Sequence, residues 1–218
     1  MSNLLSDLSN LLSIGVLKVG SFQLKSGNVS PFYIDLRRVM SHPAIFNSMV
    51  DAIHAKKQEQ AINADVVCGV PYTSVPIAAA YMSRFEIPLI MRRKEAKGYG
   101  TNKQVEGVFQ KGQTCLVVED TVVSGTSILE TALDLRKVGL VVSDCICVLD
   151  RTQGGKANLK KHGITLHSVF DFEDMFSLYC SINTVGDDLK FTVKKYLDEN
   201  VCSIDNDADT TPCSNGPS

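Results

Sequence analysis

Short apolar runs alternate with segments of helical spacing from about residue 43 onward, and this alternation constrains the fold more than any other feature. The apolar runs predict strands at 64–70, 87–92, 114–120, 141–150 and 165–170. Apolar residues at helical spacing predict helices at 41–58, 74–84 and 125–139. Strands separated by helices of this length form βαβ units, so we expect an α/β fold with a mainly parallel sheet flanked by helices.

The length and composition fit one α/β domain, with two small domains as the alternative, and exclude several other classes of protein. The chain has 218 residues, of which 44% are apolar, enough for one substantial core. The formal net charge of −2 argues against a nucleic-acid-binding surface, and no apolar run approaches the roughly 18 residues of a membrane span. The first 15 residues predict a short amphipathic helix, because Asp7 and the lack of a basic start do not fit a signal peptide.

The cysteines and histidines carry no pattern of a metal site. Most of the seven cysteines lie inside apolar runs, and no pair has the spacing of a zinc ligand set. Buried, reduced thiols in a cytoplasmic protein are the simplest interpretation. The four histidines are scattered, and we assign them no chemistry.

Two polar segments interrupt the alternation. Residues 93–107 contain three glycines, and together with Arg92 this stretch carries a dense group of cations; a loop of this length in a compact domain is usually functional or disordered. Residues 201–218 lack Lys and Arg and are rich in Ser, Asp, Asn and Thr. We therefore expect a folded domain at 1–200, followed by a disordered tail or linker at 201–218.

The stretch "VVEDTVVSGTSILE", residues 117–130, predicts a ligand site. Glu119 and Asp120 end an apolar strand, where ligands bind in open parallel sheets. The small residues that follow lead into a helix N-terminus, whose free backbone N–H groups favour a phosphate. Because carboxylates repel phosphate, the acids need another partner, such as ribose hydroxyls, Mg²⁺ or a developing cationic carbon. The alternative is that the two acids only cap the helix.

The string from the strand through "EDTVVSGTS" resembles the phosphoribosyl pyrophosphate (PRPP) motif of the type I phosphoribosyltransferases. Further motifs, "FQLKSGNVSPFYIDLR", "GVPYTSVPIA", "MRRKEAKGYG" and "VLDRTQGG", resemble orotate phosphoribosyltransferases, above all the animal form that is the N-terminal domain of uridine monophosphate synthase. The resemblance covers about residues 4–198. It implies the type I fold, with a small N-terminal hood and a flexible lid loop at about 93–107.

The resemblance implies that the chain transfers the 5-phosphoribosyl group of PRPP to orotate, with Mg²⁺ carried by PRPP and no metal site on the protein. It implies catalytic roles for Asp120, Lys97 and Glu119. The implied PRPP contacts are Lys25, Tyr72, Thr73, Arg93, Lys94, Lys97, Tyr99, Glu119, Asp120, Thr121, Val122, Val123, Ser124, Gly125, Thr126 and Ser127. The implied orotate contacts are Tyr33, Ile34, Val123 and Arg151, with Arg37 a weaker candidate.

Several of these residues have a plain structural alternative. Lys25 could be ordinary surface, Tyr33 could be core, and Arg151 could form a salt bridge with Asp150. Val123 departs from the family pattern, which usually has threonine there; valine keeps the volume and loses the hydroxyl. Two consequences of Val123 are therefore expected as alternatives: a changed affinity for orotate, or a changed selectivity for the base.

The implied partners are orotate, PRPP and a second subunit, since in the family the lid loop reaches into the neighbouring site. A decarboxylase for orotidine monophosphate, fused or separate, is also implied. A phosphoribosyltransferase for another base and a non-catalytic PRPP-binding regulator are the alternatives. The regulator fits less well, because Lys94, Lys97 and the acid pair are all present.

Overall fold

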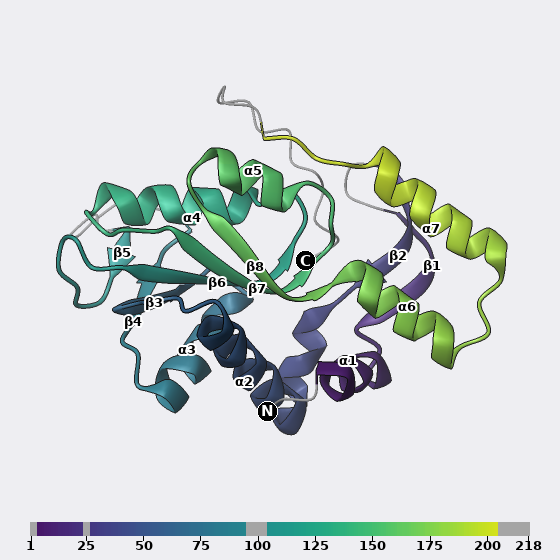
Figure 1. The fold of residues 1–218 in the computed structure, drawn as a ribbon, viewed down its shortest axis with the longest axis horizontal. Helices are drawn as coiled ribbons and strands as arrows, with labels where there is room; N and C mark the ends of the chain where they lie inside the picture. The colour runs from purple at the N-terminus through teal and green to yellow at the C-terminus, as the bar shows by residue number, and fades with distance from the viewer. Residues whose placement is uncertain (1–3, 24–26, 95–103, 205–218) are drawn as a thin grey trace.

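The computed structural model describes residues 4–23, 27–94 and 104–204 (Figure 1). Six strands form the central sheet, namely β3 (Val66–Gly69), β4 (Leu89–Arg92), β5 (Val105–Glu106), β6 (Cys115–Val122), β7 (Asp144–Asp150) and β8 (Thr165–Asp171). Their order is β5-β4-β3-β6-β7-β8, and every neighbouring pair is parallel except β4 with β5. The predicted α/β class and parallel sheet are confirmed.

Helices cover both faces of this sheet, as Figure 1 shows. One face carries α2 (Pro43–Glu59) and α3 (Ser74–Phe85), and the other carries α4 (Thr126–Lys137) and α5 (Gly155–Lys161). Alternate residues of each strand pack into the two cores: Leu116 and Val118 of β6 face the α2 side, whereas Cys115 and Val117 face the α4 side. Burial on both faces explains why the strand sequences are almost uninterruptedly apolar.

A smaller unit covers one end of the sheet and corresponds to the expected hood. The antiparallel strands β1 (Leu17–Gln23) and β2 (Val29–Ile34) pack with α1 (Leu4–Ser13), α6 (Phe172–Ile182) and α7 (Asp187–Glu199). A short 3-10 helix, η1 (Leu36–Ser41), leads from β2 to α2. Phe32 of β2 stacks on Phe172 with ring centroids 4.2 Å apart and meets Tyr196 edge-on at 5.7 Å. These aromatic contacts lie within the hood, whose buried residues belong to the same hydrophobic core as one face of the sheet.

The structure moves several predicted boundaries. The strand predicted at 114–120 continues to Val122, so Thr121 belongs to β6 and not to the turn. The loop expected at 93–107 contains the short strand β5, which pairs with β4; its central part, 95–103, lies outside the described residues. The packed chain also continues past residue 200, because Cys202 and Ile204 are buried against the α5 region. Residues 205–218 of the expected tail lie outside the described part.

Across the described ranges, no helix is both long and apolar enough to cross a membrane.

Candidate active site

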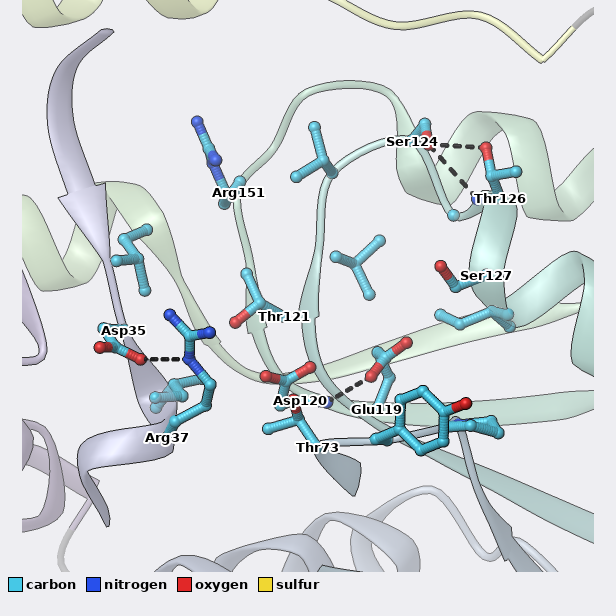
Figure 2. A pocket seen from close by; sticks show the side chains of 18 of the residues that line it. Asp35, Arg37, Thr73, Glu119, Asp120, Thr121, Ser124, Thr126, Ser127 and Arg151 are labelled. Carbon is cyan, nitrogen blue, oxygen red and sulfur yellow. Dashed lines mark hydrogen bonds and ion pairs between the residues drawn. The ribbon is translucent and has the colours of Figure 1, made fainter. Parts of the chain in front are cut away.

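One pocket of about 430 Å³ lies beyond the carboxyl ends of β3, β6 and β7 (Figure 2). It is lined by Tyr33, Ile34, Asp35, Leu36, Arg37, Pro71, Tyr72, Thr73, Lys94, Glu119 to Ile128, Glu130 and Arg151. A parallel sheet places ligands at this edge. The five segments that the sequence pattern singled out as separate motifs therefore meet at a single site.

The turn from β6 into α4 forms one wall of the pocket. Gly125 occupies the N-cap with φ +86°, a left-handed conformation that glycine adopts without strain. The hydroxyls of Ser124 and Thr126 lie 2.8 Å apart, and the Thr126 amide donates to Ser124 Oγ at 3.3 Å. The first helical hydrogen bond runs from Leu129 to Gly125, so the amides of Ser127 and Ile128 have no acceptor within the helix. This wall can accept an anion.

Glu119 and Asp120 lie in β6 and do not cap α4. The N-cap is Gly125, and no side chain caps the helix. The interpretation of the two acids as helix caps is therefore wrong. Figure 2 shows both carboxyl groups in the part of the pocket away from Arg151.

Glu119 has an unusual environment for a carboxyl group. Its Oε1 accepts hydrogen bonds from Ser74 Oγ at 2.6 Å and from the Asp120 amide at 2.9 Å. Burial raises the pKa of Glu119 well above its ordinary value, the negative charge of Asp120 adds to the rise, and the bond from Ser74 opposes it. A perturbed acid in a pocket is typical of a functional site.

Arg151 follows β7 and lines the opposite end of the pocket. Its guanidinium carbon lies 4.9 Å from the centroid of the Phe32 ring, a cation–π contact. Burial lowers the pKa of Arg151, and its contact with Tyr196 opposes the shift. Its Nε is buried and has no hydrogen-bond partner among the described residues. This arginine is poised for an anionic group of a ligand.

The alternative pairing of Arg151 with Asp150 does not occur in the described structure. Asp150 accepts the Thr152 amide at 2.9 Å and lies 3.8 Å from Lys156 Nζ. Burial raises the pKa of Asp150, and the Thr152 amide and Lys156 partly offset that rise. The sequence neighbour of Arg151 is thus engaged elsewhere.

Most of the remaining expected contacts also line the pocket. Tyr33 OH accepts a hydrogen bond from Arg37 Nη2 at 2.7 Å, and Arg37 Nε donates to Asp35 at the same distance. Lys94 Nζ lies 5.8 Å from the centroid of the exposed Tyr72 ring. Arg37 thus belongs to the site more firmly than the sequence indicates.

Arg93 is the described exception, because it does not line the pocket. Its Nε pairs with Glu106 Oε1 at 3.0 Å, and its amide donates to the Gln104 carbonyl. Lys25, Lys97 and Tyr99 lie outside the described residues.

The pocket also contains residues that the sequence analysis did not assign. Asp35, Leu36 and Pro71 belong to motifs that carried the family resemblance but were given no role there. Ile128 and Glu130 lie on the first turns of α4, and no sequence signal distinguishes them from ordinary helix residues. Within the described chain, no group of three or more His, Cys, Asp or Glu side chains is arranged to hold a metal ion.

Comparisons with known proteins agree with this geometry. The family model "Phosphoribosyl transferase domain" matches residues 38–179. Uridine 5'-monophosphate synthase of Bos taurus is 41% identical over 94% of this chain, which spans only 43% of that protein. Orotate phosphoribosyltransferase of Caenorhabditis elegans is 40% identical over 86% of this chain and 83% of its own length.

Solved structures give the same answer. The crystal structure of orotate phosphoribosyltransferase from Aeropyrum pernix superposes with a TM-score of 0.71 and 32% identity, covering 78% of this chain and 96% of that one. The match over most of the length of two such relatives shows the family directly. The chain belongs to the phosphoribosyl transferases and, within them, to the orotate phosphoribosyltransferase family.

Proposed function

We propose that this chain transfers the 5-phosphoribosyl group of PRPP to orotate, giving orotidine 5'-monophosphate and pyrophosphate, a step of pyrimidine biosynthesis. The observation that carries the proposal is the pocket itself. It places an anion-accepting helix N-terminus, a pair of acids and a buried arginine around one space of about 430 Å³. Each of these groups matches a different part of the two substrates.

The 5'-phosphate belongs at the turn Ser124–Ser127. Backbone amides at the start of α4 and the hydroxyls of Ser124 and Thr126 supply its hydrogen-bond donors. The ribose hydroxyls then fall toward Glu119 and Asp120, which accept their hydrogen bonds. Positive charge that develops on the anomeric carbon as pyrophosphate departs lies in the negative field of the same two acids.

The departing pyrophosphate needs cationic partners. Lys94 lines the pocket beside Tyr72 and Thr73, and this end of the site is the proposed place for the pyrophosphate. Arg93, Lys97, Tyr99 and Lys25 remain proposed PRPP contacts from the family pattern. Arg93 pairs with Glu106 in this structure, so its proposed contact requires release from that partner.

Orotate belongs at the Arg151 end. A guanidinium binds a carboxylate through two parallel hydrogen bonds, and the neighbouring Tyr33 and Ile34 offer flat and apolar contact to the ring. Val123 lines the same pocket and offers no hydroxyl to the base.

Mg²⁺ is proposed to arrive with PRPP. The partly buried carboxylate of Asp120 beside Glu119 fits a hydrated magnesium ion, because hard cations prefer carboxylate and water oxygens. When bound, the ion neutralises charge on the pyrophosphate.

The assembly and location are proposed on separate grounds. A homodimer with the lid loop shared between subunits follows from the family pattern, as does a partner decarboxylase, fused or separate. The fused form is supported by the bovine relative, of which this chain spans 43%. Cys68, Cys115, Cys145 and Cys147 are free and buried, as expected for a reducing compartment, whereas Cys202 is disulfide-bonded and departs from that expectation. The proposed cytoplasmic location rests on the four free thiols.

The test is a comparison of bases. Purified chain is mixed with PRPP and Mg²⁺ and given orotate, uracil, hypoxanthine or adenine in separate reactions, and loss of each base is followed by absorbance. We expect turnover with orotate alone or far above the others. Preferred use of another base would replace orotate as the substrate, and PRPP binding without any turnover would identify a regulator.

A further inference from the structure

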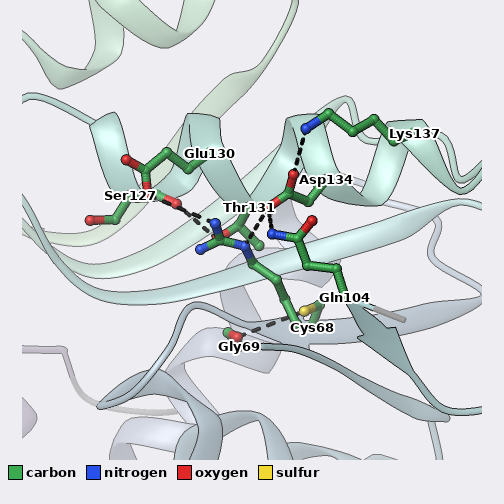
Figure 3. Close-up of polar contacts among 9 residues, drawn as sticks. Cys68, Gly69, Gln104, Ser127, Glu130, Thr131, Asp134 and Lys137 are labelled. Carbon is green, nitrogen blue, oxygen red and sulfur yellow. Dashed lines mark hydrogen bonds and ion pairs between the residues drawn. The ribbon is translucent and has the colours of Figure 1, made fainter. Parts of the chain in front are cut away.

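Arg92 and Gln104 contact the same carboxylate from two ends of a chain segment. Arg92 is the last residue of β4, and Gln104 directly precedes β5. Arg92 Nε and Gln104 Nε2 each donate to Asp134 Oδ2 at 2.8 Å. Figure 3 shows Gln104 and Asp134 facing each other between β4 and helix α4. The Asp134 side chain on α4 therefore bonds to Arg92, just before residue 93, and to Gln104, just after residue 103.

This network is buried in a way that surface ion pairs are not. The side chains of Arg92 and Asp134 are 8% and 7% exposed. Burial raises the pKa of Asp134, but hydrogen bonds from Lys137 and Arg92 outweigh it, so the net pKa lies below the ordinary value. Asp134 therefore remains ionised among its three partners, Arg92, Gln104 and Lys137. A buried, fully paired carboxylate fixes geometry more tightly than an exposed one, whose partners exchange with water.

The network borders the pocket on two sides without entering it. Arg92 Nη2 lies 3.9 Å from Glu130, which lines the pocket one turn before Asp134 on α4. Lys94, two residues after Arg92, lines the pocket beside Tyr72. Arg92 itself is absent from the lining. The sequence grouped Arg92 with the cations of the loop, but the structure gives it a different position.

We propose that Arg92 is a positioning residue: with Asp134 and Gln104 it holds the strand end that carries Lys94 at a fixed place relative to the phosphate turn of α4. Helix α4 begins at that turn, so Asp134 connects the proposed pyrophosphate end of the pocket to the proposed 5'-phosphate end. The inference rests on the proposed function for the identity of the ligand. It adds that Arg92, which lies outside the pocket, sets the distance between Lys94 and the phosphate turn of α4.

The test replaces Arg92 by methionine, which keeps a long side chain and removes both the charge and the donors. We expect the KM for PRPP to rise roughly tenfold or more and kcat to fall, because small misplacement of binding groups is costly. The KM for orotate should stay within about twofold, since the Arg151 end of the pocket does not touch the network. Arg92→Lys, which keeps the charge, should recover part of the loss.

Lys137→Met is the matched control. Lys137 donates to the other oxygen of the same carboxylate at 2.9 Å, but its side chain is 71% exposed and does not line the pocket (Figure 3). Its replacement should leave all three kinetic constants unchanged. Where Arg92→Met fails to fold, Gln104→Leu carries the test, because it removes one donor to Asp134 and retains the buried ion pair.

The outcomes separate this inference from the proposed function. If the wild-type chain does not turn over orotate, the proposed function fails, and PRPP affinity measured by titration calorimetry still compares the Arg92 and Lys137 variants. A selective loss of PRPP affinity supports the positioning role. Equal PRPP constants in the two variants, or a parallel rise of both KM values with a lowered melting temperature, would overturn it.

Discussion

The hydroxyl of Ser74 lies 2.6 Å from Glu119 Oε1, and both side chains are buried. Ser74 begins α3 directly after the pocket residues Pro71–Thr73, whereas Glu119 lies within β6, so this hydrogen bond joins the proposed pyrophosphate and ribose parts of the site. It also favours the ionised form of Glu119 against burial and the neighbouring charge of Asp120.

Ser74→Ala should therefore raise the pKa of Glu119 further. Ionised Glu119 is the active form in the proposed mechanism, so activity rises with pH as this group loses its proton. Removing a donor to the carboxylate moves that rise to higher pH and lowers kcat most at acidic pH. The pH profile of kcat measures the effect, with Ser181→Ala on the exposed face of α6 as control. Superimposable profiles would show that the bond does not influence the active ionisation.

Arg151→Ala should reduce discrimination between orotate and uracil. Uracil lacks the carboxylate, so the wild-type site would leave a buried guanidinium without its partner, a loss of about 2–5 kcal/mol. The variant should therefore lose orotate turnover by much more than tenfold and change the poor uracil turnover little. Arg84→Ala is the control, because Arg84 pairs with Asp51 in an exposed position on α3. An equal loss for both bases would point to a structural role for Arg151.

Gly125→Ala should weaken both the fold and the phosphate turn. An added Cβ would lie 2.8 Å from Leu159 Cγ, and the φ of +86° strains any other residue. Gly163→Ala is a matched control, because φ is +68° there and nothing lies within 4 Å of the added carbon.

The control isolates the backbone strain, about 1–2 kcal/mol, and Gly125→Ala should add about 1–3 kcal/mol from overpacking. Denaturant unfolding measures both free energies. PRPP affinity should fall in the Gly125 variant alone, and equal affinities would argue against a phosphate at this turn.

Mixing two inactive variants tests the proposed dimer. In Lys97→Ala the proposed lid contact is lost, and in Asp120→Asn the proposed electrostatic contact is lost. If the loop acts across the subunit boundary, a hybrid dimer contains one site with both wild-type groups, and mixing recovers part of the activity. Mass spectrometry of the intact assembly confirms subunit exchange. Exchange without recovery would mean that Lys97 serves its own subunit.

The sequence predicts the central sheet well because its strands are buried on both faces. Near-continuous apolar runs such as 64–70 and 114–120 have no other place in an α/β protein. The hood is less readable: β1 contains Gly20 and mixes exposed with buried residues, and α7 buries only Val193 fully. Such elements depend on contacts with distant segments, for example Phe32 with Phe172, that no local pattern records.

The same contrast holds within the site. The turn Ser124–Ser127 can be predicted from the sequence, because a phosphate-accepting helix start needs small residues in consecutive positions. The position of Arg92 outside the pocket cannot be predicted, because its partner Asp134 is 42 residues away and resembles any charged helix residue in the sequence. Arg93 shows a further limit: its local pairing with Glu106 depends on the antiparallel strand β5, which the loop-like sequence does not predict.

The measurement that bears most directly on the central claim is the product balance of the wild-type chain and Asp120→Asn, prepared identically. With orotate, PRPP and Mg²⁺, the wild type should form one orotidine 5'-monophosphate and one pyrophosphate for each PRPP consumed, as read by liquid chromatography with mass detection. Asp120→Asn keeps an acceptor oxygen for the ribose, so it should lose less PRPP affinity than turnover, which should fall roughly a hundredfold because charge stabilisation in the transition state is lost. Hydrolysis of PRPP without nucleotide, or equal turnover by both proteins, would contradict the account.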